Sequence, residues 1–188
     1  MTFIENGPGD VTLGEADRAA ALAEVKAALH LVANDEDALI AAYAETALGL
    51  AEQFLGRVLI VRAMTERLPA SACWQALGAA PVMAITAVSR VGSDGIVALP
   101  VEAYAIDLDA EANGWVRLTA PDGDPVAVAY QAGWLGGWTM IPAPVRQGVV
   151  MLAAHLYAAR DAREPPPAAV TALWRPFRAV ALDRAARA

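Results

Sequence analysis

The residue types that most often perform acid–base or nucleophilic chemistry are scarce in this chain, which has two histidines and one cysteine. His155 lies in a helical pattern whose neighbouring sequence supplies no acid–base partner, so a core or interface role is favoured over catalysis. His30 ends an earlier helical pattern, where a cation complements the helix dipole. Cys73 has no C-x-x-C partner, and the pattern favours a buried thiol over a nucleophile.

Two pairs of aspartates have a spacing that could chelate calcium. They are Asp107 with Asp109, and Asp122 with Asp124. Both pairs flank predicted hairpin turns, where aspartate commonly accepts hydrogen bonds from the backbone, and the ligand loop of an EF-hand is absent. Glycine-rich phosphate-binding motifs and the G-x-S-x-G nucleophile motif are also absent. The sequence therefore predicts no catalytic residue, no metal site and no cofactor.

The composition predicts more apolar surface than one small core can bury. Hydrophobic residues make up 57% of the 188 residues. No run approaches the roughly 20 uninterrupted apolar residues of a bilayer span, and the first residues lack the pattern of a secretory signal. A single cysteine cannot form an internal disulfide, so we expect folding in a reducing cytoplasm. The excess apolar surface indicates oligomerisation rather than membrane insertion.

Charge is unevenly divided along the chain. From Ala143 onward there are seven basic and three acidic residues, whereas the preceding part has seven basic and 18 acidic residues. The C-terminal part is therefore about +4 and the rest about −11. An acidic body is unsuited to general DNA binding, because the phosphate backbone repels it. An acidic body with a basic tail is suited to joining unlike protein surfaces head to tail.

Hydrophobic periodicity predicts an α+β protein with a mainly helical body. Helices are expected over residues 15–31 and 35–56, and the short loop between them predicts an antiparallel pair. Residues 58–134 contain short alternating segments separated by turn sequences, a pattern typical of an inserted antiparallel β-meander. Two C-terminal helices follow, over residues 142–162 and about 168–186. The β insert thus separates two N-terminal from two C-terminal helices.

The chain divides into three predicted parts. Residues 1–14 lack periodicity and are expected to form a flexible arm, residues 15–164 a folded domain, and residues 165–188 a docking segment. Aromatic residues and arginines, which are enriched in interface hot spots, mark this last segment. A solvated amphipathic tail and a nucleic-acid-binding helix are the alternatives. The candidate docking residues are Trp174, Arg175, Phe177, Arg178, Arg184 and Arg187.

The helix predicted over residues 142–162 has two different sides. Its apolar side, with Val145, Val149 and Leu152, is expected to close the core. The opposite side has small or polar residues that allow a neighbouring subunit to approach closely. The candidate subunit-interface residues are Gln147, Ala154, Ala158 and Asp161.

The order of several segments resembles the head-to-tail connector, or adaptor, proteins of long-tailed phages and phage-like gene transfer agents. The resemblance covers roughly Ala20 to Arg160 and includes the helix–β–helix order. The segments are EVKAALHL, NDEDALI, AEQFLGRVLI, APVMAITAVSRVGSDGI, YAIDLD, VAVAYQAGW and IPAPVRQGVVMLAAHLYAAR.

The resemblance implies a structural ring of identical subunits, twelve in number, below the portal protein. DNA would pass through the lumen without sequence-specific binding, and a stopper or tail-completion protein would follow the ring. The resemblance also implies that the C-terminal segment docks on the portal, and that subunits fold in the bacterial cytoplasm before joining the neck of the particle.

Three other functions remain open from the sequence. The chain could be another neck component, such as the stopper or tail-completion protein itself. It could be a small cytoplasmic enzyme that uses His155. It could also be a nucleic-acid-binding module centred on the last helix.

Overall fold

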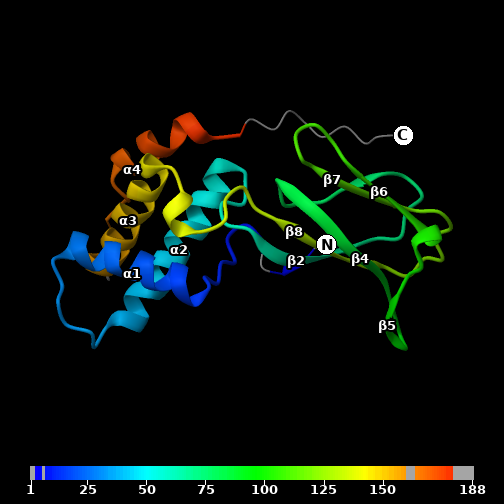
Figure 1. Cartoon of the computed structure of the whole chain (residues 1–188), viewed down its shortest axis with the longest axis horizontal. Helices are drawn as coiled ribbons and strands as arrows, with labels where there is room; N and C mark the ends of the chain where they lie inside the picture. The colour runs from blue at the N-terminus through cyan, green and yellow to red at the C-terminus, as the bar shows by residue number, and fades with distance from the viewer. Residues whose placement is uncertain (1–2, 6, 160–163, 180–188) are drawn as a thin grey trace. The chain divides into compact units, whose positions relative to one another are not determined.

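A computed structural model describes residues 3–5, 7–159 and 164–179 of the chain (Figure 1). The chain divides into two compact units. A β-unit contains Met1–Gly7 and Ile60–Trp134, and a helical unit contains Pro8–Leu59 and Leu135–Val180. The predicted α+β class, with helices before and after an antiparallel β insert, is confirmed.

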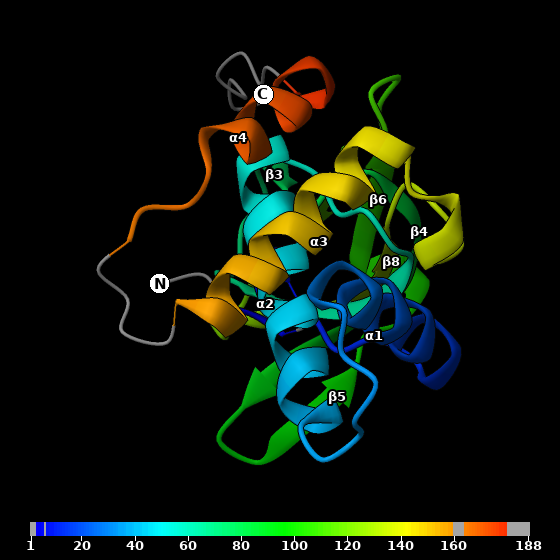
Figure 2. The same cartoon turned by 90° about the vertical axis from the view of Figure 1, so that its left-hand side faces the viewer.

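The helical unit contains four α-helices in the described part of the chain. They are α1 (Glu15–Leu29), α2 (Asp37–Leu55), α3 (Ala143–Ala158) and α4 (Ala168–Trp174), with the 3₁₀ turns η2 (Trp138–Met140) and η3 (Arg175–Phe177). Helix α3 packs against each of the other three helices (Figure 2). Fully buried side chains at the centre of this packing include Val25, Ile40, Leu48, Val145 and Val149.

The helix ends follow from local backbone chemistry. Helix α1 ends at Leu29, two residues before the predicted end, because the cap residue His30 leaves the helical region with a φ of 55°. Helix α2 ends at Leu55, where the cap residue Gly56 adopts a φ of 68° that glycine takes without strain. Helix α2 begins two residues later than residue 35, because Asn34 accepts a hydrogen bond from the Asp37 amide in a preceding turn, 3.3 Å. Helix α3 ends at Ala158, within the predicted range 142–162.

The two places where the chain leaves and re-enters the helical unit are adjacent. The Leu135 amide donates a hydrogen bond to the Leu59 carbonyl, 2.9 Å. The buried Glu52 carboxylate fixes the exit by accepting a hydrogen bond from the Leu59 amide, 2.9 Å. A buried carboxylate is stable only with such partners, so this turn is firmly defined.

The β-unit contains two antiparallel sheets. The larger has the order β1-β2-β8-β4-β5 and the smaller β3-β7-β6. The strands are β1 (Phe3–Glu5), β2 (Arg62–Leu68), β3 (Gln75–Ala76), β4 (Val82–Gly92), β5 (Gly95–Ala98), β6 (Tyr104–Leu108), β7 (Gly114–Leu118) and β8 (Val126–Ala132), with the 3₁₀ turn η1 (Val101–Ala103) after β5.

The strand order differs from that of a simple meander. Strand β8 lies between β2 and β4 and pairs with both, so strands distant in sequence become neighbours. Alternate residues of β8, among them Val126, Val128 and Tyr130, are buried, which shows that one face of the strand is covered. Turn sequences report only local hairpins such as β4–β5 and β6–β7, and therefore could not reveal this central position of β8.

The expectation that residues 1–14 form an arm is corrected at two places. Phe3–Glu5 is a strand that pairs with Thr65–Arg67 of β2. Further along, the Leu13 side chain is buried and its amide donates a hydrogen bond to Glu45 Oε1, 3.0 Å. Both contacts join residues far apart in sequence, so periodicity within this short segment could not indicate them.

In the part of the chain that the structure describes, no helix combines the length and the apolar composition needed to cross a membrane.

Candidate assembly surfaces

Helix α3 presents the predicted interface residues on one side. Gln147 and Ala158 are exposed and Ala154 is partly exposed, whereas Val145 and Val149 are buried in the helical unit. The spacing of positions 147, 154 and 158 places them along one face of the helix. Asp161 lies outside the described residues. The structure therefore brings three of the four candidates together on an accessible surface, and their role in subunit contact remains a prediction.

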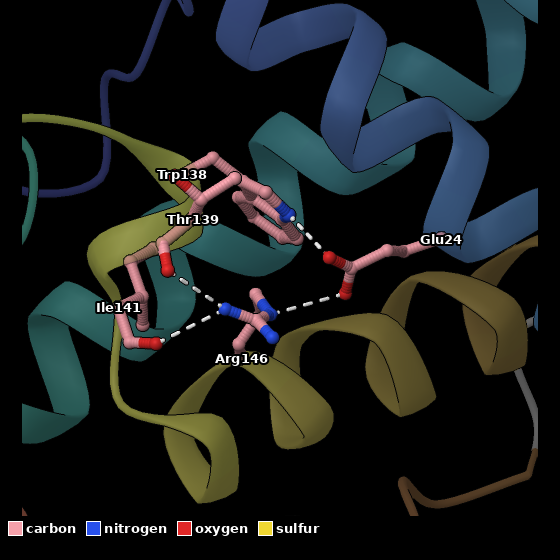
Figure 3. A network of polar contacts seen from close by, with 5 residues as sticks. All are labelled: Glu24, Trp138, Thr139, Ile141 and Arg146. Carbon is pink, nitrogen blue, oxygen red and sulfur yellow. Dashed lines mark hydrogen bonds and ion pairs between the residues drawn. The ribbon is translucent and has the colours of Figure 1, made fainter.

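The N-terminal end of α3 is fixed by a polar network around Glu24 of α1 (Figure 3). Glu24 Oε1 accepts a hydrogen bond from the indole of the fully buried Trp138, 3.1 Å, and its Oε2 pairs with Arg146 Nε, 3.2 Å. Arg146 Nη1 also donates to the carbonyls of Thr139 and Ile141. One carboxylate thus joins α1, η2 and α3, so the exposed side of α3 has a defined orientation within the helical unit.

Trp174 is buried within its own subunit, which does not fit its predicted role as a docking residue. Its side chain is 3% exposed, and its indole N–H donates to the Val145 carbonyl, 3.0 Å. Its ring also packs on Phe54, with centroids 5.8 Å apart. A Cβ at Gly148 would lie 2.3 Å from Trp174 Nε1, so only glycine permits this approach. An indole offers a large apolar area, and here α4 uses that area to bind α3 of its own subunit.

The residues after Trp174 are more accessible. Arg175 and Arg178 are exposed and Phe177 is partly buried. The Arg178 guanidinium lies 5.6 Å from the centre of the Phe54 ring, and the Ala179 amide donates to the Leu55 carbonyl, 2.8 Å. Arg184 and Arg187 lie outside the described residues. Arg178 thus lies near the C-terminal end of α2, where a cation is favoured by the helix dipole.

His155 and Cys73 show no arrangement for catalysis. The partly buried His155 lies with Nε2 3.1 Å from the Glu164 carbonyl, a backbone partner that cannot act as an acid or base. Cys73 is exposed, so the prediction of a buried thiol was wrong. Its amide donates to Ser71 Oγ, 3.0 Å, in a turn that presents the thiol to solvent although the local sequence is apolar. His30 occupies the predicted C-terminal cap position of α1.

One aspartate of each pair, Asp109 and Asp122, accepts hydrogen bonds from backbone amides in a turn, as the sequence predicted. Asp109 accepts hydrogen bonds from the Glu111 and Asn113 amides and from the Trp115 indole. Burial alone would raise the pKa of Asp109, but the hydrogen bonds from Trp115 and Asn113 outweigh it and hold the pKa below its usual value. The hydrogen bond from Arg90 likewise lowers the pKa of Asp122. Among the described residues, no group of three or more His, Cys, Asp or Glu side chains could hold a metal ion.

Two important residues had only weak signals in the sequence. Gly148 interrupts a helical pattern, and an isolated glycine inside a helix often marks a close approach by another element. Glu24 appeared to be one of many surface carboxylates, because its partners Trp138 and Arg146 are more than 110 residues away. Long-range partners of this kind cannot be identified from one sequence.

No protein-family model matches the chain, and no curated protein matches it. Solved structures do match. A chain in the neck of an empty gene transfer agent (GTA) particle, computed with C6 symmetry, has a TM-score of 0.70 at 24% identity. The match covers 96% of this chain and 97% of that chain.

Two further matches come from gene transfer agent particles. A chain of the virion of a native gene transfer agent particle has a TM-score of 0.66 at 26% identity, and 92% of this chain and 95% of that chain are covered. A chain in the neck of a native GTA particle, computed with C12 symmetry, has a TM-score of 0.67 at 25% identity, with 91% and 94% covered. The resemblance to neck connector proteins is therefore confirmed, because the chain is similar over nearly its whole length to chains from the necks and the virion of gene transfer agent particles.

Proposed function

We propose that this chain is a structural subunit of the neck of a phage-like particle, in which it forms a ring adaptor between the portal and the tail. The observation that carries the proposal is the likeness to neck chains over both units and nearly the full length of each chain. A match to one unit alone would support only a shared domain. A match to both supports a shared architecture, and therefore a structural rather than an enzymatic role.

The symmetry of the similar necks supports a ring of identical subunits. Those structures were computed with C6 and C12 symmetry. Each subunit in such a ring has two different surfaces that meet head to tail. The exposed side of α3, with Gln147, Ala154 and Ala158, is the surface that we assign to one half of this contact. Small alanine side chains allow the backbone of a neighbour to approach closely, and we propose twelve subunits.

The net charge is compatible with DNA passing through the ring. The chain has a formal charge of −7, and twelve copies would carry a large negative charge around the axis. DNA phosphates gain no counterion-release energy at such a surface, so the nucleic acid would not adhere during passage. We place assembly in the bacterial cytoplasm and the final position at the neck, with a stopper or tail-completion protein on the tail side.

The C-terminal segment is proposed to dock on the portal. The candidate residues are now Arg175, Phe177 and Arg178, together with Arg184 and Arg187, without Trp174. A chain that ends after Ala179 is expected to keep α4 and the fold but to bind portal rings at least about tenfold more weakly, because two arginines of the patch are lost. Co-purification with portal rings measures this binding. Undiminished binding by the shortened chain would move the portal contact elsewhere.

Deletion of this gene alone tests the proposed role as a whole. In a strain that produces the particles, capsids and tails are expected to accumulate separately, because the joint between them is missing. Electron microscopy of the purified particles would show this directly. A matched strain that carries the gene on a plasmid should restore joined particles. Joined particles in the deletion strain would contradict the proposal, and tails that stay attached to a shortened neck would indicate a different neck component.

A further inference from the structure

The β4–β5 hairpin exposes an apolar edge. All four residues of β5 are exposed, with Ile96 at 71% and Val97 at 50%, and Val101 just beyond is 70% exposed. Residues 95–101 include no charged side chain. Figure 1 shows the hairpin extending away from the other strands of the β-unit. Natural proteins protect edge strands with charges or a covering element, so an apolar edge of this kind indicates a surface that becomes covered on assembly.

The helical unit has a complementary hollow between α1 and α2. Its volume is about 330 Å³, and its apolar lining comes from Ala19, Leu22, Ala38 and Ala41. This hollow is open to solvent, so the side chain of an isoleucine could enter it. The rim has the charged residues Glu15, Arg18 and Asp37. Asp37 is already paired with Lys26, 2.6 Å, whereas the ion pair between Arg18 and Glu45 is long at 4.0 Å and the Arg18 side chain is 43% exposed.

One residue of the rim, Arg18, could pair with an acidic residue of the hairpin, whereas Glu15 and Asp37 of the rim carry negative charge. Exposed Asp94 lies in the β4–β5 turn, two residues before Ile96. An apolar side chain entering the hollow would therefore bring a carboxylate towards the Arg18 guanidinium. The projecting apolar residue belongs to the β-unit and the hollow belongs to the helical unit. That arrangement suits the heterologous contact of a ring, in which one surface meets a different surface of the next copy.

We infer that the β4–β5 hairpin of one subunit inserts Ile96 into the α1–α2 hollow of the next copy of this chain, with Asp94 facing Arg18 of that copy. The inference rests on the proposed ring and adds a specific contact to it. The contact involves residues other than the α3 surface, so each subunit would be joined to its neighbour by a projecting hairpin as well as by helix packing.

Disulfide trapping in assembled particles tests this contact. Cys73 is first replaced by serine, and cysteines are then introduced at Asp94 and Ala19, both exposed. The control pairs Asp94→Cys with Ala27→Cys, an exposed position eight residues further along α1 and therefore about 12 Å away. After mild oxidation, non-reducing gels are expected to show a ladder of linked subunits for the Ala19 pair, at least about tenfold stronger than for the Ala27 pair.

The outcomes separate this contact from the proposed function. Particles that show the ring by electron microscopy but give no ladder, equal ladders for both pairs, or a link to a different neck protein would overturn the contact and leave the ring intact. Absence of this chain from purified particles would overturn both.

A charge exchange provides an independent measurement. Asp94→Arg and Arg18→Asp should each reduce joined particles about tenfold, and the double variant should restore them. A double variant no better than either single variant would contradict the pairing.

Discussion

Replacing Ala158 by glutamate is expected to abolish the ring while leaving the monomer folded. The side chain is exposed in the isolated chain, so the new carboxylate remains in water there. In the proposed ring it would be buried against a neighbour without a partner, at a cost of about 3–5 kcal/mol per contact. Such a cost weakens each contact by more than about 100-fold. The same result is expected for Ala154→Glu. Ring formation is measured by electron microscopy of particles, and folding by circular dichroism of the purified chain.

Two control variants separate charge at the interface from charge in general. Ala120→Glu places the same carboxylate at an exposed loop position of the β-unit, and Ala154→Ser keeps a small side chain on α3. Both should give normal particles. If the Ala158→Glu and Ala154→Glu variants formed rings in normal yield, this side of α3 would not contact a neighbour.

Trp174→Ala is expected to cause a large loss of stability in the helical unit. The side chain is 3% exposed and packs on Phe54, and its indole donates to the Val145 carbonyl. Removing a buried aromatic side chain leaves a cavity, with a cost of about 3–5 kcal/mol. Urea denaturation followed by far-UV circular dichroism measures this loss. A decrease below about 1 kcal/mol would show that α4 contributes little to the fold.

A matched tryptophan provides the control. Trp134 is 41% exposed, so Trp134→Ala should cost much less. Gly148→Ala tests the same contact between α3 and Trp174. It should also lower stability, because a methyl group there would lie 2.3 Å from Trp174 Nε1 and would displace the ring. If Gly148→Ala were as stable as the natural chain, the close approach of α3 and α4 would be contradicted.

Local signals were sufficient to predict α1, α2 and α3. The last helix, predicted over about 168–186, ends at Trp174 and is followed by the turn η3, which contains Pro176. The apolar side of α3 with Val145, Val149 and Leu152 is buried, as its periodicity indicated. Gly56 ends α2 in the left-handed conformation that glycine adopts without strain. Each of these features depends on residues within a few positions of one another, so a single sequence contains the necessary information.

Long-range packing accounts for most of the differences between the sequence predictions and the structure. Trp174 and Arg178 had the same signal in the sequence, an aromatic or basic residue on a C-terminal helix, yet one is buried and the other exposed. The difference arises from Gly148 and Phe54, which lie far away in the chain and create space for a ring at one position only. The central position of β8 and the pairing of β1 with β2 depend on equally distant partners. The choice of interface residues on α3 could be made from the sequence, but their function still depends on the experiments described above.

Because the Leu135 amide donates a hydrogen bond to the Leu59 carbonyl, the two ends of residues 60–134 join the helical unit side by side, an arrangement that would permit the exchange of this segment in evolution. A domain whose two ends lie side by side can replace another such domain at this junction without moving α2 or α3. Recombination between related genomes could therefore give a neck subunit a new β-unit while preserving its helices. The strand β1 is the part that would need a new partner, because its pairing strand β2 belongs to the exchanged segment.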